Sequence, residues 1–450
     1  MHVDNDAAPL MLAPDVLAET LTSAMGTGAE FAEVFVEDRR SISALFDDGR
    51  VEELTSGRDR GAGLRVVAGD TTGFAHTADL SPLGLRSAAE AAAAAARGGG
   101  GGVRQVSLDQ HTGPAPGPVG IMPGDVPKAR KVALLERADA AARGSDGAIT
   151  QVAVRYADSH RRIQVANSDG LLTGDRQVRT LFSVFCVASG DMGMQTGRES
   201  VGHTLGFEVF DEVDVEDLAR RAAGRALLKL EAVPAPSGEM PVVIGPGGGG
   251  VLFHEACGHG LEADLVAKSA SVFAGRRGEV VAAPIVTLVD DGTMPGEWGR
   301  CAIDDEGRPA QRNVLIDEGV LTDYMWDHLR ACREGRASSG NGRRQGYRHL
   351  PMVRMTNTYL GVGDADPDEI IADTAHGVYV AQLGGGQVNT ATGDFVFGMT
   401  EAYMIEDGRL TNPIRDGNLI GNGPQTLLDI DVIAGDFAMG SPGTCGKDGQ

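Results

Sequence analysis

Two histidines and a glutamate stand close together in the stretch His254-Glu255-Ala256-Cys257-Gly258-His259. Two neutral imidazoles can hold a zinc ion, and a carboxylate beside the first histidine can take a proton from a water molecule at the metal. The familiar spacing is HExxH, which places both histidines on one face of a helix. Here it is HExxxH, and on an ideal helix His254 and His259 would lie about 140° apart. The sequence therefore predicts a π-bulge between the two histidines, or a helix that breaks before the second one.

The residues around this motif are rich in glycine. Gly258 and Gly260 flank His259 and make a local distortion inexpensive, so we expect Gly258 to lie where the helix is distorted. Upstream, the turn Gly245–Gly250 follows the apolar run Val242-Val243-Ile244 and could cradle a phosphate at a helix N-terminus. No Lys and no Ser or Thr follows these glycines, so the phosphate-loop motif fails. The plainest alternative is a pair of histidines near a helix end that are satisfied by the backbone.

A catalytic zinc site needs a third protein ligand, and the candidate is Cys445 in Gly443-Thr444-Cys445-Gly446-Lys447. A thiolate is a good zinc ligand, and the nearby Lys447 would favour the ionised form. The plainer alternative is a small residue in a glycine loop. Cys257 lies between the two histidines, and we interpret it as a packing residue rather than a nucleophile. The five cysteines are scattered and include no CxxC pair, so no disulfide framework is expected.

The overall composition excludes several classes of function. The chain has 450 residues and a formal net charge of −23, so little material is available for the basic face that binds nucleic acid. No run of about 18 apolar residues occurs, so no membrane span is expected. The acids near the N-terminus do not fit a signal peptide, and we expect a cytoplasmic protein. The 64 glycines are about twice the usual share and indicate many turns and close backbone approaches.

Changes of pattern along the chain predict an α+β protein with two domains. Residues 1–237 form an N-terminal α/β domain with a Gly- and Pro-rich excursion at 98–127, in which Gly98–Gly102 acts as a linker. Residues 238–450 form the C-terminal domain that carries the metal-site motif. A hairpin is expected around Asp47-Asp48-Gly49, between short strands over 42–46 and 51–54, with separate strands over 30–37, 63–67 and 72–76. An antiparallel meander is expected from 150 to 201. Helical spacing predicts N-terminal helices over 14–25, 81–96, 128–143 and 214–230.

The C-terminal domain is mostly strand and turn. Its strand candidates are 285–289, 314–321, 352–360, 378–383, 394–406 and 409–413. Its helix candidates are 250–262, 323–334, 366–373 and 424–429.

The HExxxH motif and its continuation resemble a known family. The stretch from His254 to Asp264, HEACGHGLEAD, is similar to the signature of the TldD-type subunit of the TldD/TldE (TldD/PmbA) metalloprotease family. The similarity spans most of 240–450. Further segments match in order: Asp304-Asp305-Glu306-Gly307, Gly340–Arg344, Arg354–Thr358, Gly384–Val388 and Gly443–Lys447.

This resemblance implies a zinc peptidase in which His254, His259 and Cys445 hold the metal and Glu255 is the catalytic general base. It implies an N-terminal α/β domain, followed by a C-terminal domain rich in antiparallel, barrel-like β-sheet that carries the metal-site helix. Family members act on peptides or unstructured protein segments. They pair with a TldE/PmbA-like partner subunit or form homodimers. The TldE type lacks the HExxxH motif, so the chain resembles the catalytic type.

Substrate binding is less sharply indicated. Gly384, Gly385 and Gly386 could let a peptide backbone approach an exposed strand edge, and a glycine-rich hairpin bend is an equal alternative. Arg343 and Arg344 are expected to be interface or surface charges.

Family members usually continue past the Cys-Gly-Lys-x-Gly-Gln motif with a short tail, whereas this chain stops at Gln450. If that tail packs beside the cysteine, its absence bears on the order of the third ligand.

Two other functions stay open. One is a non-catalytic peptide-binding or scaffold subunit with a structural metal, which a closed four-ligand site would favour. The other is a zinc amidase that acts on a small molecule, which a narrow, enclosed pocket would favour.

Overall fold

The computed structural model describes residues 10–96, 105–111, 113–191, 193–443 and 445–447 of the chain. The predicted linker Gly98–Gly102 lies outside these residues. Within the described part, no helix combines the length and the apolar character that crossing a membrane requires.

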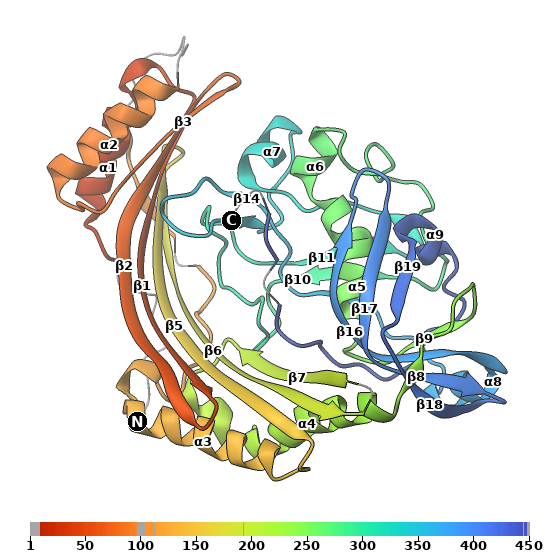
Figure 1. Ribbon diagram of the computed structural model, residues 1–450. Helices are drawn as coiled ribbons and strands as arrows, with labels where there is room; N and C mark the ends of the chain where they lie inside the picture. The colour runs from red at the N-terminus through yellow and green to blue at the C-terminus, as the bar shows by residue number, and fades with distance from the viewer. Residues whose placement is uncertain (1–9, 97–104, 112, 192, 444, 448–450) are drawn as a thin grey trace.

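The N-terminal half is built on one long, strongly curved sheet (Figure 1). Its strand order is β3-β2-β1-β5-β6-β4, and β7 also pairs with β6. All neighbouring strands are antiparallel except β4 and β6. The strands are β1 (Phe31–Asp47), β2 (Arg50–Ala68), β3 (Thr71–Thr77), β4 (Asp109–Gln110), β5 (Ile149–Asn167), β6 (Leu171–Gly190) and β7 (Gly193–His203).

The predicted hairpin joins β1 to β2. Asp48 and Gly49 both have positive φ, 46° and 75°, as a two-residue hairpin turn requires. The prediction of short, separate strands on either side was wrong, because β1 and β2 run unbroken for 17 and 19 residues. Strand β2 is exposed over its first half and buried over its second, and β1 is buried over its first eight residues but exposed or half-buried in its middle, so the alternating pattern is interrupted and hides their continuity.

Four helices cover the outer face of this sheet, and the C-terminal half lies against its inner face (Figure 1). The predicted helix starts are confirmed by their caps: Ser81 Oγ accepts a hydrogen bond from the N–H of Gly84, and the Asp214 carboxylate caps α4. Two separate apolar clusters lie between helices and sheet, one under α1 and α2 and one under α3 and α4. These helices are α1 (Pro14–Ala24), α2 (Pro82–Ala95), α3 (Lys128–Arg143) and α4 (Val215–Glu231).

The described part of the Gly- and Pro-rich excursion is anchored to the N-terminal half. Val106, Val119 and Val126 are all buried. Strand β4 adds to the sheet edge, and a 3-10 turn at Pro123–Asp125 leads into α3.

The C-terminal half contains three open sheets, and no closed barrel is present in the described residues. The largest has the order β8-β18-β17-β16-β9, with β19 also paired to β17: β8 (Val233–Pro234), β9 (Val242–Ile244), β16 (His376–Val388), β17 (Asp394–Glu406), β18 (Arg409–Arg415) and β19 (Asn418–Asn422). A second has the order β12-β11-β10-β15: β10 (Leu288–Asp291), β11 (Arg312–Asp317), β12 (Val320–Leu321) and β15 (Thr358–Leu360). The smallest pairs β13 (Gly342–Arg343) with β14 (Met352–Val353). The other α-helices in the described residues are α5 (Gly250–Phe253), α6 (Ala263–Ala267), α7 (His328–Arg333), α8 (Pro367–Asp373) and α9 (Gly423–Leu428).

Several details here differ from the predictions. Strand 352–360 is broken into β14 and β15, because Thr356 and Thr358 turn their side chains to the buried carboxylate of Asp290. Helix 323–334 is confined to α7, and β19 was not predicted. The predicted boundary at 237 falls between β8 and β9, which belong to one sheet, and it stays a prediction.

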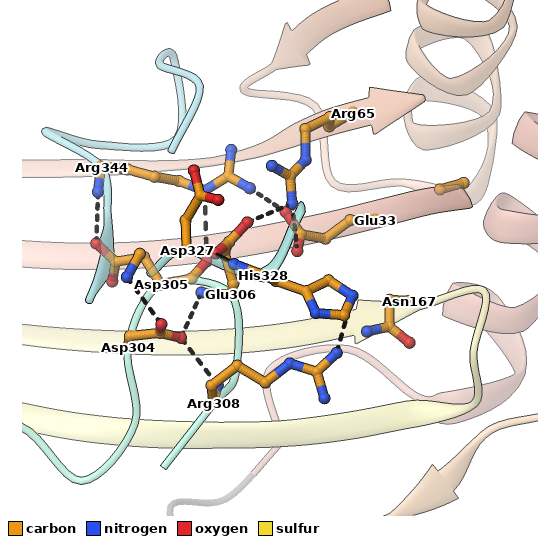
Figure 2. A network of polar contacts seen from close by, with 12 residues as sticks. Glu33, Arg65, Asn167, Asp304, Asp305, Glu306, Arg308, Asp327, His328 and Arg344 are labelled. Carbon is orange, nitrogen blue, oxygen red and sulfur yellow. Dashed lines mark hydrogen bonds and ion pairs between the residues drawn. The ribbon is translucent and has the colours of Figure 1, made fainter. Parts of the chain in front are cut away.

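Buried charges join the two halves (Figure 2). Arg65 on β2 lies 2.7 Å from Glu306 and 3.1 Å from Glu33 of β1. Arg344 from the C-terminal half also pairs with Glu33, so it is an interface charge. These side chains are at most 3% exposed, so each charge depends on its partners for solvation.

Candidate metal centre

The HExxxH motif lies on a helical segment that changes pitch at the first histidine. Helix α5 (Gly250–Phe253) passes into a π-helical turn, His254–Gly258, and then into a 3-10 turn, His259–Leu261. The N–H of His259 donates to the carbonyl of His254, the i to i+5 bond of a π-turn. The two imidazole rings are therefore neighbours, with centroids 4.7 Å apart. The predicted π-bulge is confirmed.

Gly258 lies at the distortion, as expected. A Cβ at this position would stand 2.3 Å from Met355 Sδ and 3.3 Å from the carbonyl oxygen of Phe253. The glycine-rich turn before the helix has a similar role, since a Cβ on Gly248 would stand 2.0 Å from the carbonyl oxygen of Ala381 on β16. Glycine thus lets the helical segment pack directly against β16 and against Met355, which lies between β14 and β15.

The structure brings together all four predicted chemical groups. Ligand atoms of His254, Glu255, His259 and Cys445 lie within 4.8 Å of one another. His259 Nε2 is 3.1 Å from Cys445 Sγ and 3.8 Å from Glu255 Oε2. His254 Nε2 is buried without a hydrogen-bond partner among the described residues. An orphaned ring nitrogen, a second imidazole, a thiol and a carboxylate at one point fit a metal ion. Their individual roles stay a prediction.

The electrostatics of the two imidazoles differ sharply. Burial, with the nearby charges of His259 and Arg354, lowers the pKa of His254 to about 3, so this ring is neutral and keeps a lone pair. Burial would also lower the pKa of His259, but hydrogen bonds with Cys445 and Glu262 outweigh it and raise that pKa to about 10. A proton and a metal ion compete for the same nitrogen of His259. Burial raises the pKa of Glu255, which suits a group that must accept a proton.

A second layer of charges, which the sequence did not reveal, surrounds the donors. Glu262 is fully buried, and its Oε2 accepts a hydrogen bond from His259 Nδ1 at 3.1 Å. A carboxylate on the far ring nitrogen fixes the tautomer and leaves Nε2 for a metal. We expected the Lys447 ammonium to favour the Cys445 thiolate, but its hydrogen bonds go to Glu262 and Asp264. The only sequence signal for Glu262 was an acid three residues after His259.

Cys257 points away from the donors. It is fully buried in the core of the C-terminal half, and its Sγ donates to the carbonyl of Phe253 at 3.1 Å. Burial raises its pKa to about 12, so the thiolate is not available at neutral pH. Its interpretation as a packing residue fits this environment.

Gly384–Gly386 lie on β16, the strand against which the metal-site segment packs. The register between β16 and β17 shifts between Leu383 and Gly386. A Cβ on Gly385 would meet no atom within 4 Å, whereas one on Gly386 would stand 2.0 Å from the ring of Phe397. These residues are therefore next to the candidate site, and their role in substrate binding stays a prediction.

Comparisons with known proteins agree over most of the chain. Three successive family models match: PmbA/TldA metallopeptidase domain 1 over residues 32–96, the central domain over 121–230, and the C-terminal domain over 237–447. A metalloprotease TldD homolog of Haemophilus influenzae is 38% identical over 94% of this chain and 89% of its own length. A metalloprotease of Methanothermobacter thermautotrophicus is 37% identical over 94% and 91%. A zinc metalloprotease TldD homolog of Saccharolobus solfataricus is 28% identical over 67% of each chain.

Solved structures agree on the fold. A crystal structure from Thermotoga maritima has a TM-score of 0.80 at 20% identity and covers 94% of this chain and 96% of that one. The crystal structure of TldE from Thermococcus kodakarensis has a TM-score of 0.75 at 22% identity, with 92% of each chain covered. Since the family models follow one another across both halves and two of these relatives align over 94% of the residues, the chain belongs to the PmbA/TldD family of metallopeptidases.

Proposed function

We propose that this protein is a zinc-dependent peptidase, with His254, His259 and Cys445 as the zinc ligands and Glu255 as the general base. The observation that carries the proposal is the π-turn, which gathers two imidazoles, a carboxylate and a distant thiol within 4.8 Å. A nitrogen and sulfur donor set suits zinc. The zinc metalloprotease among the relatives supports the same metal.

Zinc bound here would act as a Lewis acid toward the scissile carbonyl and acidify water. Glu255 is positioned by the π-turn, with its Oε2 3.8 Å from His259 Nε2. Its half-buried carboxylate takes a proton from the attacking water and passes it to the leaving amine nitrogen. His254, which is neutral, and His259, which is oriented by Glu262, present ring nitrogens on the same side of the helical segment.

The substrate would bind as an added strand along β16. Strand β9 pairs with β16 only at Val378–Val380. Beyond Leu383, whose N–H bonds to Gly248, no strand among the described residues pairs with that edge. Backbone pairing at an open edge gives affinity with little sequence preference, as an unfolded peptide requires. Gly384–Gly386 would leave room for the added backbone, and Gly385 has that room.

Two measurements test this proposal. Wild-type protein is expected to bind zinc and to cleave an unfolded peptide. The variants His259→Ala and Cys445→Ala should lose the zinc, whereas Lys268→Ala, a change at an exposed residue nearby, should keep it. A zinc content in Cys445→Ala equal to that of the wild type would contradict Cys445 as the third ligand.

Peptides N-methylated at single backbone nitrogens test whether the substrate binds as an added strand: methylation at alternate positions should raise KM. Equal KM at every position would contradict it, and cleavage of small amides but no peptide would favour an amidase.

The same proposal includes a second subunit. A TldE structure shares this fold over 92% of each chain, which supports pairing with a TldE/PmbA-like subunit or with a second copy. Light scattering of the protein alone and with a co-expressed TldE-type chain distinguishes a homodimer from a heterodimer. A monomer under both conditions would contradict the pairing.

A further inference from the structure

The segment that carries Cys445 has little structure of its own. Among the described residues of 436–447, none lies in a helix or strand, and no hydrogen bond between two backbone groups ties them to the rest of the described chain. Pro442 lies against Gly202, next to which Trp298 also lies, and Gly440 lies against Gly247. Side-chain contacts beyond Pro442 must therefore hold the thiol beside the histidines.

Lys447, two residues after Cys445, makes the strongest of these contacts. Its Nζ donates to Asp264 Oδ1 at 2.7 Å, to Glu262 Oε2 at 2.9 Å and to the carbonyl of Val353 at 3.1 Å. An ammonium has three N–H donors, so this set uses all of them. The Lys447 side chain is 8% exposed and the two carboxylates at most 3%, so water contributes little at this point.

Arg354 makes the other contact to the segment. Its Nη2 donates to the carbonyl of Cys445 at 2.6 Å, and its Nε lies 3.9 Å from Glu262 Oε1. Glu262 therefore touches His259 on one side and the cations that hold the cysteine segment on the other. His259 and Cys445 are 186 residues apart in sequence, and Glu262 contacts both His259 and the cations that hold the Cys445 segment.

We propose that Lys447 and Asp264 are positioning residues that lock the Cys445 segment onto the HExxxH segment, so that the thiol is held ready for the metal. Glu262 and Asp264 are buried acids that need a cation, and Lys447 supplies it only when its segment is docked. The pair thus acts through Cys445 and touches neither metal nor substrate. This inference rests on the proposed function, in which Cys445 is a zinc ligand.

The test compares Lys447→Ala, Lys447→Arg, Asp264→Ala and the double variant, with Lys268→Ala as the control for loss of an exposed lysine. All are made in a Cys332→Ser background, because Cys332 and Cys445 are the two cysteines that are not buried. The first readout is the rate at which an aromatic disulfide reagent modifies Cys445 in zinc-free protein. The second is the zinc Kd from competition with a chelator. Thermal unfolding of each variant confirms that it is folded.

Lys447→Ala is expected to raise the rate of Cys445 modification at least ten-fold and to weaken zinc binding about 10- to 100-fold, the usual effect of losing a supporting group at a metal site. Lys447→Arg should recover part of both, and the double variant should cost little more than either single alanine variant. Thiol rates and zinc Kd within two-fold of the parent would overturn the inference, as would full additivity. If the parent itself binds no zinc, the proposed function fails, while the thiol rates still decide whether Lys447 holds the segment.

Discussion

The buried ion pairs between the two halves offer a test of how the fold is held together. Arg65 on β2 contacts Glu306 at 2.7 Å and Glu33 at 3.1 Å, and both acids are fully buried. Arg65→Met keeps an apolar stem of similar length but removes the cation. Glu306 lies in the same loop as Asp304. The Asp304 carboxylate accepts a hydrogen bond from the N–H of Gly342 on β13, and β13 pairs with β14, which leads to the metal centre.

The expected loss is about 3–5 kcal/mol of unfolding free energy, because the buried Glu306 loses its cation and Glu33 keeps only Arg344. That is a large part of the roughly 5–15 kcal/mol by which native proteins are usually stable. A matched control is Arg348→Met. Arg348 pairs with Asp59 in the same region, but their side chains are 47% and 46% exposed, so the expected loss is about 0–1 kcal/mol.

Urea unfolding followed by circular dichroism and by tryptophan fluorescence measures both effects. The two tryptophans, Trp298 and Trp326, lie in the C-terminal half, so fluorescence reports on that half alone. Arg65→Met should lower the midpoint and separate the two transitions, because the pair joins the halves. An Arg65→Met protein that loses no more stability than Arg348→Met would refute this reasoning.

Three further predictions follow from the contacts. Gly258→Ala places a Cβ 2.3 Å from Met355 Sδ and should lower the unfolding free energy by about 1–3 kcal/mol, measured by thermal unfolding. The control Gly250→Ala, whose Cβ would have no atom within 4 Å, should leave the stability unchanged. Equal effects of the two substitutions would contradict the close packing at the π-turn. Cys257→Ser should keep peptide cleavage within a few-fold of wild type, and abolished turnover in a folded variant would make Cys257 a nucleophile. Burial alone would raise the pKa of Glu306, but Arg65 and the N–H of His328 hold it below its ordinary value. This acid therefore stabilises the fold above about pH 4.3 and ceases to do so as pH falls through its lowered pKa. The stability gap between wild type and Arg65→Met should therefore narrow as pH falls from about 5 to about 3, and a gap that stays constant over that range would contradict it.

Local signals in the sequence predicted the local features well. The off-pattern spacing of His254 and His259 demanded a π-turn or a break, and Asp48-Gly49 demanded a hairpin turn. The caps at Ser81 and Asp214 marked two helix starts within a residue. Each of these depends on residues a few positions apart, which a single sequence displays directly.

The features that were missed depend on distant partners. Lys447 binds Glu262 from 185 residues away, and nothing near either residue marks the pair. Strand 352–360 breaks because Asp290 accepts hydrogen bonds from Thr356 and Thr358, about 66 positions further along the chain. An alternating apolar pattern cannot report a competing hydrogen bond from another strand.

The central claim is that Glu255 moves protons at a zinc ion which other residues hold. Its most direct test is Glu255→Gln, measured for zinc content and for cleavage of an unfolded peptide beside the wild type. The account predicts an unchanged zinc content and cleavage that is slower by about 10²- to 10⁴-fold, the usual contribution of a general base. A variant that keeps its zinc and cleaves at the wild-type rate would contradict the account. So would loss of the zinc itself, which would make Glu255 the fourth ligand of a closed structural site.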